Sequence, residues 1–573
     1  MGKRKIYLFT SLIMIISGII WTFTNLAPDE GYQIAMAYRI SQGDSLLTEM
    51  LEPHQFSALL TGFLVYLYQA IFGTYTGVVV YLHLAGILIR AGLAAVLYMI
   101  LKKETEKPLA YGAAVLFFMI TPKDFAMPEY GNQQAWYGLL CFVFLMMYFR
   151  SKKLRFLVPA AISLCLQVLA YPSCILSYAV IVVLLILDGE KSQLKKEIAL
   201  FTGVCALIGG GLVLYLVGKN GLQEIGDSLR MMTAIEPSHT VGVGSRLLRY
   251  GRNIAELLAV YAIVAVASLL ITSAVLAVLK KKKSYGKEFR QALFLAIFGI
   301  ILLIGFFLNI LLMTDRCAYT VIFIYMTSVG LFYSKKLSGE VKRLYVVGTI
   351  LGISCVVSTL ILTDLPFVVS GAYGVLAIAL SVIPLRKMSV DLESSPIRKT
   401  YFVMFAAFVC LLFARCVYIR TPLTGRSQIC TILNEDMSYV HNGPAKWIIT
   451  NNEGAMIQQV SYEEFRENIP MGSKVWLVDS IEDSLGYMYG GYEVAIPSVM
   501  SDPKYQYEAY YDVLKEYWEK HPDKYPDVVA VKAYKGDISY DILASGLLMD
   551  FIEKEYKPVR SVDGTYWKLY FRE

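Results

Sequence analysis

Long apolar runs separated by short polar segments make up residues 1–419 of the chain. A helix needs about 20 mostly apolar residues to cross about 30 Å of hydrocarbon, and most of the runs reach or approach that length. The pattern predicts a polytopic α-helical membrane protein. We expect about thirteen transmembrane helices, at residues 6–25, 77–101, 109–122, 133–149, 156–171, 173–189, 198–218, 256–279, 291–313, 317–334, 344–363, 367–385 and 400–419.

Positive charges fall mainly in short clusters between these runs, for example at residues 3–5, 102–107, 150–155 and 280–283. Since lysine and arginine are enriched in cytoplasmic loops, an even number of crossings should separate neighbouring clusters. We therefore predict a multi-pass protein of the cell membrane with a cytoplasmic N-terminus. A further span at 56–73 would break this rule, so we expect that segment to be a helix at the outer membrane surface.

The composition changes at residue 420, where a polar segment begins. Domain 1–419 is thus the transmembrane part, with long outer loops at 26–76 and 219–255, and 420–573 is a small extracytoplasmic α/β domain. We expect strands at 446–450, 474–479, 492–496, 527–533 and 566–571, and helices at 456–467, 505–519 and 541–553. This domain has no GxGxxG, P-loop or GxSxG motif, so binding or scaffolding is its expected role.

Composition agrees with a membrane protein and excludes some functions. Hydrophobic residues make up 56% of the chain and charged residues 17%, which is too apolar for a soluble protein. The net charge of +7 lies in the loop clusters, so no nucleic-acid partner is expected. Most of the nine cysteines lie in apolar runs, which gives no disulfide framework and no cysteine metal site.

An acidic pair, Asp29 and Glu30, follows the first apolar run. After Pro28 these carboxylates suit the first turn of a helix, whose free N–H groups stabilise negative charge. The alternative is chemical, because a carboxylate at the membrane boundary can act as a general base toward a hydroxyl group. Partial desolvation there would raise its pKa toward the working range.

The loop that begins DEGYQIAMAYRISQGD resembles the first outer loop of the GT-C superfamily of glycosyltransferases, in particular the protein O-mannosyltransferase and lipid A aminoarabinose-transferase-like group. The resemblance also covers the span number and the outer C-terminal domain. It implies Asp29 as catalytic base, with Glu30 beside it. The loop's usual proline-rich turn is here EPHQF, with His54 displaced. The matching positions are Asp29, Glu30, Tyr32, Gly43, Asp44, Pro53, Phe72 and Gly73.

Two arginines are candidates for binding a lipid phosphate. Arg90 lies inside an apolar run, where a charge is costly and often functional, although a structural ion pair is equally expected. Arg316 lies at the outer start of a span, where the resemblance places an arginine that contacts the donor phosphate. A guanidinium group suits a phosphate, while lipid-headgroup anchoring is the simpler alternative.

The second outer loop, TPKDFAMPEYGNQQ, brings Lys123, Asp124 and Glu129 to the same membrane face as Asp29. In GT-C enzymes an acidic residue of this loop often joins the active site, which favours Asp124 over Glu129. A divalent metal held by Asp29, Asp124 and either His54 or His239 stays open. The histidines form no ligand-spaced cluster, so we predict no metal site and no other cofactor.

These observations predict an inverting glycosyltransferase that moves a sugar from a polyprenyl-phosphate donor to a hydroxyl of a cell-envelope acceptor on the outer face. Asp29 would be the general base, Glu30 its neighbour, and the substrate-binding residues Tyr32, His54, Arg90, Lys123, Asp124, Glu129 and Arg316. A flippase or polysaccharide exporter is the first alternative. A non-catalytic scaffold for envelope assembly is the second.

Overall fold

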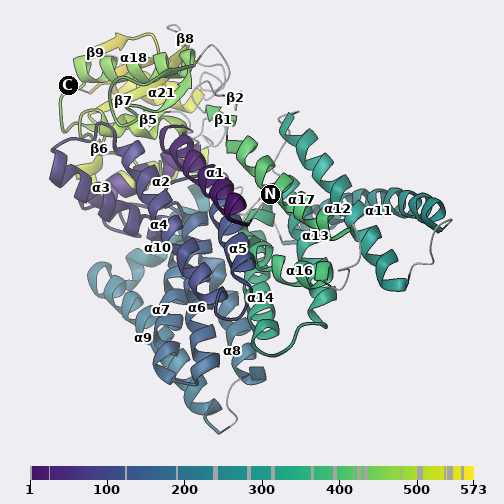
Figure 1. The fold of residues 1–573 in the computed structure, drawn as a ribbon. Coiled ribbons are helices and arrows are strands. Elements are labelled where there is room, and N and C mark those ends of the chain that lie inside the picture. The colour runs from purple at the N-terminus through teal and green to yellow at the C-terminus, as the bar shows by residue number, and fades with distance from the viewer. Residues whose placement is uncertain are drawn as a thin grey trace.

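The structure is a computed structural model of the 573-residue chain (Figure 1). It describes all residues except 1–2, 25, 27, 123–124, 189–191, 236–242, 281–285, 312–316, 363–366, 391–396, 417, 422–427, 432–436, 479–480, 500–507, 535–536, 539–545, 557–559 and 573. The fold is a large helical bundle with a small sheet-containing region at one end.

Twelve of the thirteen predicted spans each contain one α-helix, and the span 173–189 begins with the 3-10 helix η4 (Pro172–Ile175) before its α-helix. The segment 367–385 is instead broken into η6 (Phe367–Gly374), α15 (Val375–Leu380) and α16 (Val382–Val390). The twelve helices are α1 (Lys3–Phe23), α4 (Val78–Leu101), α5 (Lys107–Met119), α6 (Tyr130–Ser151), α7 (Leu157–Ala170), α8 (Leu176–Asp188), α9 (Leu194–Asn220), α11 (Val243–Lys280), α12 (Lys287–Leu311), α13 (Cys317–Ser334), α14 (Gly339–Leu362) and α17 (Ile397–Cys416).

Six helical segments in the described part of the chain are long and apolar enough to cross a membrane: Gln55–Phe72, Val78–Leu101, Leu194–Asn220, Gly244–Leu279, Phe289–Leu308 and Gly339–Ile361. The chain is therefore a mainly helical, multi-pass membrane protein. The thirteen-span count and the orientation of the termini stay predictions. Gln55–Phe72 includes the helix that we expect at the outer surface, so length and composition alone do not distinguish the two placements.

The first long loop contains two helices rather than an open coil. α2 (Pro28–Gln42) has proline as its first residue, and η1 (Gln55–Ser57) leads directly into α3 (Ala58–Phe72). Gly73 ends α3 in the left-handed conformation, with φ of 66°, which glycine adopts without strain. The second long loop was predicted at 219–255, but α10 (Leu222–Ile235) and the first turns of α11 occupy much of it.

The C-terminal domain contains a mixed sheet, as the alternating pattern predicts. Its strands run in the order β6-β5-β7-β10-β9, with β8 paired to β7. β5 is parallel to β6 and β7, whereas β10 is antiparallel to β7 and β9. The strands are β5 (Lys474–Val478), β6 (Glu493–Val494), β7 (Val528–Tyr534), β8 (Asp537–Ile538), β9 (Arg560–Asp563) and β10 (Trp567–Phe571).

Three helices accompany this sheet: α18 (Asn452–Asn468), α19 (Glu508–Lys520) and α21 (Gly546–Glu555). They match the predicted helices, and β5, β7 and β10 match three predicted strands. The prediction at 446–450 is displaced, because a turn precedes β4 (Ile449–Asn451), which pairs with β3 (Met437–Tyr439). β1 (Tyr418–Thr421) and β2 (Gln428–Thr431) form a separate pair after α17.

The sheet region contacts the loop 26–76 through buried polar groups, and Figure 1 shows it beside α2 and α3. Arg39 of α2 is buried; its Nη1 donates to the Ile496 carbonyl oxygen at 2.9 Å, and its Nε donates to Asp44 Oδ2 at 2.7 Å. The Tyr38 hydroxyl donates to the Tyr492 carbonyl oxygen at 2.8 Å. The loop 26–76 and the domain therefore lie on the same side of the bundle.

The domain also contacts the second long loop. Lys520 of α19 forms an ion pair with Asp227 of α10 at 2.8 Å, and Arg230 of α10 pairs with Glu516 of α19 at 2.5 Å. These side chains are at least partly exposed, so each pair contributes little to stability. Their role is to add a second polar contact between the bundle and the domain.

Candidate functional site

The predicted catalytic base lies where the loop 26–76 meets the bundle. Asp29 is in the first turn of α2 and is partly exposed. Its charge acts on the phenol of Tyr130, the first residue of α6. The acidic residue thus stays accessible at the edge of a site formed by the starts of α2 and α6.

Glu30, the other member of the acidic pair, has a different environment. It is completely buried, and its Oε1 lies 3.3 Å from Nε2 of His83, which is also completely buried. The other ring nitrogen of His83 is 3.2 Å from the Thr22 carbonyl oxygen, so it must donate a proton there. Nε2 of His83 therefore faces the Glu30 carboxyl group. Glu30 is therefore committed to a buried pair between α2 and α4.

A buried network of amides and hydroxyls holds the starts of α2 and α6 together. The Ser57 hydroxyl donates to Gln33 Oε1 at 3.0 Å, and Gln33 Nε2 donates to the Thr61 hydroxyl at 3.2 Å. Gln133 Nε2 donates to the Ser57 carbonyl oxygen at 2.8 Å. Thr61 in turn donates to the Pro128 carbonyl oxygen at 2.7 Å. Because these groups satisfy one another inside the protein, they fix Asp29 relative to α6.

Glu129 caps α6. Its Oε2 accepts from the Gly131 backbone N–H at 2.7 Å, and its Oε1 accepts from the Asn132 N–H at 2.5 Å. A carboxylate in this position satisfies N–H groups that have no partner within the helix. The predicted substrate-binding residue Glu129 is thus buried and occupied by a structural role next to Tyr130.

Arg90 of α4 reaches the same helix start. It is 3% exposed, its Nη2 donates to Asn132 Oδ1, and the charge of Glu129 acts on it. Among the described residues its Nη1 has no hydrogen-bond partner. α4 approaches this region closely at Gly86, where a Cβ atom would lie 2.1 Å from the Ala126 carbonyl oxygen. Arg90 is therefore a positive charge buried directly behind the start of α6.

His54 and three tyrosines form an aromatic cluster at the site. The His54 ring stacks on Tyr130, with centroids 4.1 Å apart and an interplanar angle of 4°. Tyr171 lies 5.2 Å from His54, and Tyr373 lies 6.3 Å from Tyr171. Four distant segments contribute these rings. Since His54 is only half-buried, the cluster forms one wall beside Asp29.

The structure therefore brings Asp29, Glu30, His54, Arg90 and Glu129 together around the start of α6. Three predicted residues, Lys123, Asp124 and Arg316, lie outside the described residues. In the part of the chain that the structure describes, no group of three or more histidine, cysteine, aspartate or glutamate side chains could hold a metal.

Tyr32 lies at the contact with the C-terminal region. It is buried, and its side chain acts on the Glu52 carboxylate together with Arg39. Glu52 Oε2 accepts from the Ser498 hydroxyl at 2.7 Å, and its Oε1 accepts from the Val499 N–H at 2.5 Å. Burial raises the pKa of Glu52 to about 7, although Arg39 and these hydrogen bonds oppose the change.

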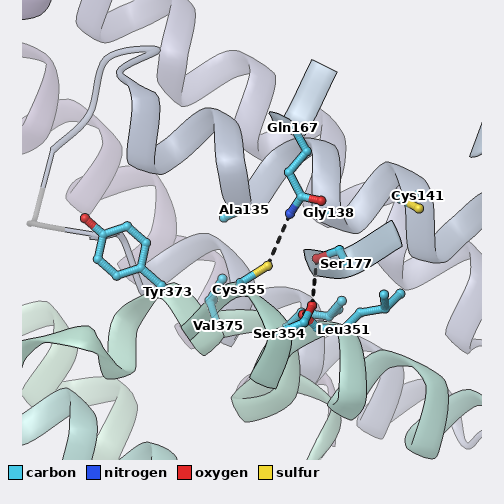
Figure 2. A pocket seen from close by; sticks show the side chains of 11 residues that line it. Ala135, Gly138, Cys141, Gln167, Ser177, Leu351, Ser354, Cys355, Tyr373 and Val375 are labelled. Carbon is cyan, nitrogen blue, oxygen red and sulfur yellow. Dashed lines mark hydrogen bonds between the residues drawn. The ribbon is translucent and has the colours of Figure 1, made fainter. Parts of the chain in front are cut away.

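A small pocket lies deeper in the bundle, among α6, α7, α8, α14 and α15 (Figure 2). Figure 2 shows Gln167 directed at Cys355, with Nε2 3.2 Å from Sγ, and Ser177 hydrogen-bonded to Ser354 at 2.9 Å. The cavity is small: the centre of a water molecule could move within only about 10 Å³ of it. That is about one water molecule, so this pocket does not hold a sugar.

Comparisons with known proteins give distant structural neighbours but no sequence match. No family model matches the sequence, and no curated protein matches it. Among solved structures the chain is similar to the archaeal oligosaccharyltransferase AglB from Archaeoglobus fulgidus, in complex with an inhibitory peptide and a dolichol-phosphate. The TM-score is 0.43 at 11% identity, over 93% of this chain and 70% of that chain.

Several residues around the start of α6 were not predicted from the sequence. Tyr130, Tyr171 and Tyr373 are three of 41 tyrosines, and nothing local distinguishes them. His83 was noticeable as a histidine inside an apolar run near Arg90. Its pairing with Glu30 depends on the packing of α2 against α4, which the sequence pattern does not give.

Proposed function

We propose that the protein is a membrane glycosyltransferase that takes a sugar from a polyprenyl-phosphate donor and passes it to a hydroxyl group of a cell-envelope acceptor. Asp29 accepts the proton of the acceptor hydroxyl. The hydroxyl oxygen bonds to the anomeric carbon as the bond from that carbon to the phosphate oxygen breaks, and the lipid phosphate leaves with the electron pair. Attack opposite the phosphate inverts the anomeric carbon.

The contrast between Asp29 and Glu30 carries this proposal. A general base must come within hydrogen-bond distance of a substrate hydroxyl to take its proton. Asp29 is partly exposed, whereas Glu30 is fully buried against His83. We therefore assign Asp29 as the base and Glu30 as a structural group.

The positive charges assigned to the site suit a departing phosphate. Arg90 has a guanidinium nitrogen without a hydrogen-bond partner among the described residues, and the predicted positive groups Lys123 and Arg316 would complement it. Guanidinium groups bind phosphate oxygens through two parallel hydrogen bonds. Stabilising the negative charge that develops on the leaving group lowers the barrier of the transfer step.

The test is consumption of labelled polyprenyl-phosphate monosaccharides by the purified full chain in lipid nanodiscs, with a cell-envelope fraction as acceptor. We expect Asp29→Asn to lose nearly all transfer. The matched control is Asp512→Asn, which removes an exposed carboxylate of α19 far along the chain from α2. Equal transfer by Asp29→Asn and the wild type would contradict the assignment. No transfer of any sugar by the wild type would contradict the proposed reaction.

A further inference from the structure

The hairpin of β3 and β4, residues 437–451, contacts the ends of two membrane helices. The Gly77 N–H, at the start of α4, donates to the Gly443 carbonyl oxygen at 3.0 Å, and the Val79 N–H donates to the Pro444 carbonyl oxygen at 3.2 Å. Thr24, at the end of α1, forms a backbone bridge with Ile449. The hairpin is therefore held at the level where α1 ends and α4 begins.

The length of α4 puts that level near the boundary between hydrocarbon and water. α4 spans Val78–Leu101, one of the segments long and apolar enough to cross the membrane. Its first residues must lie close to the headgroup layer if its apolar length fills the hydrocarbon. A segment that is hydrogen-bonded to Gly77 and Val79 lies in the same layer.

The hairpin exposes large aromatic side chains at this level. Trp447 is 48% exposed and Tyr439 is 50% exposed. Lys446 places its Nζ 4.9 Å from the centre of the Trp447 ring, and His441 lies beside Tyr439 with ring centroids 4.2 Å apart. Tryptophan and tyrosine are enriched at membrane–water interfaces, and lysine suits the phosphates of headgroups.

The backbone holds Trp447 in an unusual conformation that presents its ring. Its φ is 72°, in the left-handed region that a bulky residue rarely adopts. Its N–H donates to the Val440 carbonyl oxygen at 2.8 Å, and the next N–H, of Ile448, donates to Ala445 at 3.0 Å. The ring packs over Gly77, where a Cβ atom would be 2.8 Å from Cζ3 of Trp447.

An apolar helix surface lies next to the hairpin. The Tyr68 hydroxyl of α3 donates to the Thr76 carbonyl oxygen, directly before Gly77. Further along α3, six large side chains are exposed: Leu59, Phe63, Tyr66, Leu67, Ile71 and Phe72. Exposure of such a surface to water is costly, and contact with lipid would remove that cost.

We propose that residues 437–451 are a lipid-binding anchor, which inserts Trp447 and Tyr439 into the outer headgroup layer beside α3 and fixes the C-terminal domain to the bilayer. The partner is the lipid surface itself. This role does not depend on the transfer reaction, so it can fail or hold separately from the proposed function.

The experiment places the full chain in nanodiscs whose lipids carry bromine either near the glycerol or near the end of the acyl chains. The measured quantity is the difference between the tryptophan emission of the wild type and that of Trp447→Phe, which isolates the emission of Trp447. We expect shallow bromine to quench this emission about twofold and deep bromine to quench it less, as for an interfacial tryptophan. The control is the emission that Trp518→Phe removes, because Trp518 is buried in the domain and should respond to neither lipid.

A second variant covers failure of Trp447→Phe to fold. Tyr439→Trp adds an emitter to the same hairpin, and its added emission should also be quenched more by shallow bromine. The proposal is overturned if neither brominated lipid quenches the Trp447 emission or the emission added by Tyr439→Trp, while iodide in water quenches both. That result would describe a solvent-facing hairpin available to a protein partner.

Discussion

The contact between the loop 26–76 and the C-terminal sheet region should weaken as the pH rises. Glu52 is fully buried between Tyr32 of α2 and residues Ser498 and Val499 of the domain. Burial raises its pKa to about 7, from an ordinary value of 4.5. The docked form therefore holds a proton that the separated form releases, so docking is favoured at low pH and loses stability as the pH passes from 4.5 to 7.

The magnitude follows from that difference in pKa. Each tenfold change in proton affinity corresponds to about 1.4 kcal/mol, so raising the pH above 7 should cost docking about 3 kcal/mol. The pKa of Asp44 is shifted in the opposite direction, below its ordinary value. Burial alone would raise its pKa, but the charges of Arg39 and Lys524 lower it, and the stability that Asp44 adds is lost only in acid. Between pH 5 and 9 the Glu52 effect should dominate.

Amide hydrogen exchange measures this effect at the contact itself. The Val499 N–H donates to Glu52, and the Leu51 N–H donates to the Pro497 carbonyl oxygen at 2.8 Å. After correction for the intrinsic exchange rate, protection of these amides should fall by about a hundredfold from pH 5 to pH 9. Glu52→Gln should flatten this dependence, since the amide can accept from Val499 and donate to Ser498.

Two results would refute the reasoning. One is an unchanged or rising protection of Val499 with pH in the wild type. The other is the same falling curve in Glu52→Gln, which would assign the pH dependence to another group.

Three further substitutions test other parts of the structure. Arg39→Lys should reduce the protection of the Tyr492 to Pro497 segment and destabilise docking by about 2 kcal/mol or more, because a lysine cannot replace the hydrogen bonds to Asp44 and Ile496 together; unchanged exchange would count against it. His83→Leu should lower stability by about 3 kcal/mol or more, since it leaves a buried carboxyl group without its histidine, and adding Glu30→Leu should recover most of the loss in a thermal unfolding assay. Gly86→Ala should lower the thermal stability, because the new methyl group would meet the Ala126 carbonyl oxygen; an unchanged unfolding temperature would show that the loop can move aside.

Much of the fold could be predicted because its signals are local. Apolar runs gave helices close to α1, α4 and α9, and the alternation after residue 420 gave β5, β7 and β10. Errors occurred where a local signal was weak. The polar, mostly helical segment 219–255 resembled a loop, and the run 367–385 hid a break at Ser381 between α15 and α16.

The candidate site was predicted only in part, for a physical reason. Asp29 and Glu30 are adjacent in sequence, and either carboxylate fits a helix start or a general base. Their separation into an exposed and a buried group arises because α4 brings His83 against one of them. Such long-range packing has no local signature, and neither does the gathering of His54, Tyr130 and Tyr171 from three segments.

The domain contact shows the same limit. Arg39 and Glu52 look like ordinary solvent-facing charges in the sequence, yet both are buried because the segment 492–499 supplies carbonyl, hydroxyl and N–H partners. Burial of a charge is tolerated only with such partners. The change in composition at residue 420 predicts a separate C-terminal domain, but it gives no sign that residues 492–499 contact the loop 26–76.

The most direct test of the central claim is the rate of sugar transfer in a single turnover, measured with donor bound to the wild type and to Asp29→Asn. Loss of a general base should lower this rate by about 10²-fold to 10⁴-fold, while donor affinity stays unchanged and Asp29→Glu keeps part of the rate. A single-turnover rate in Asp29→Asn equal to that of the wild type would contradict the role of Asp29.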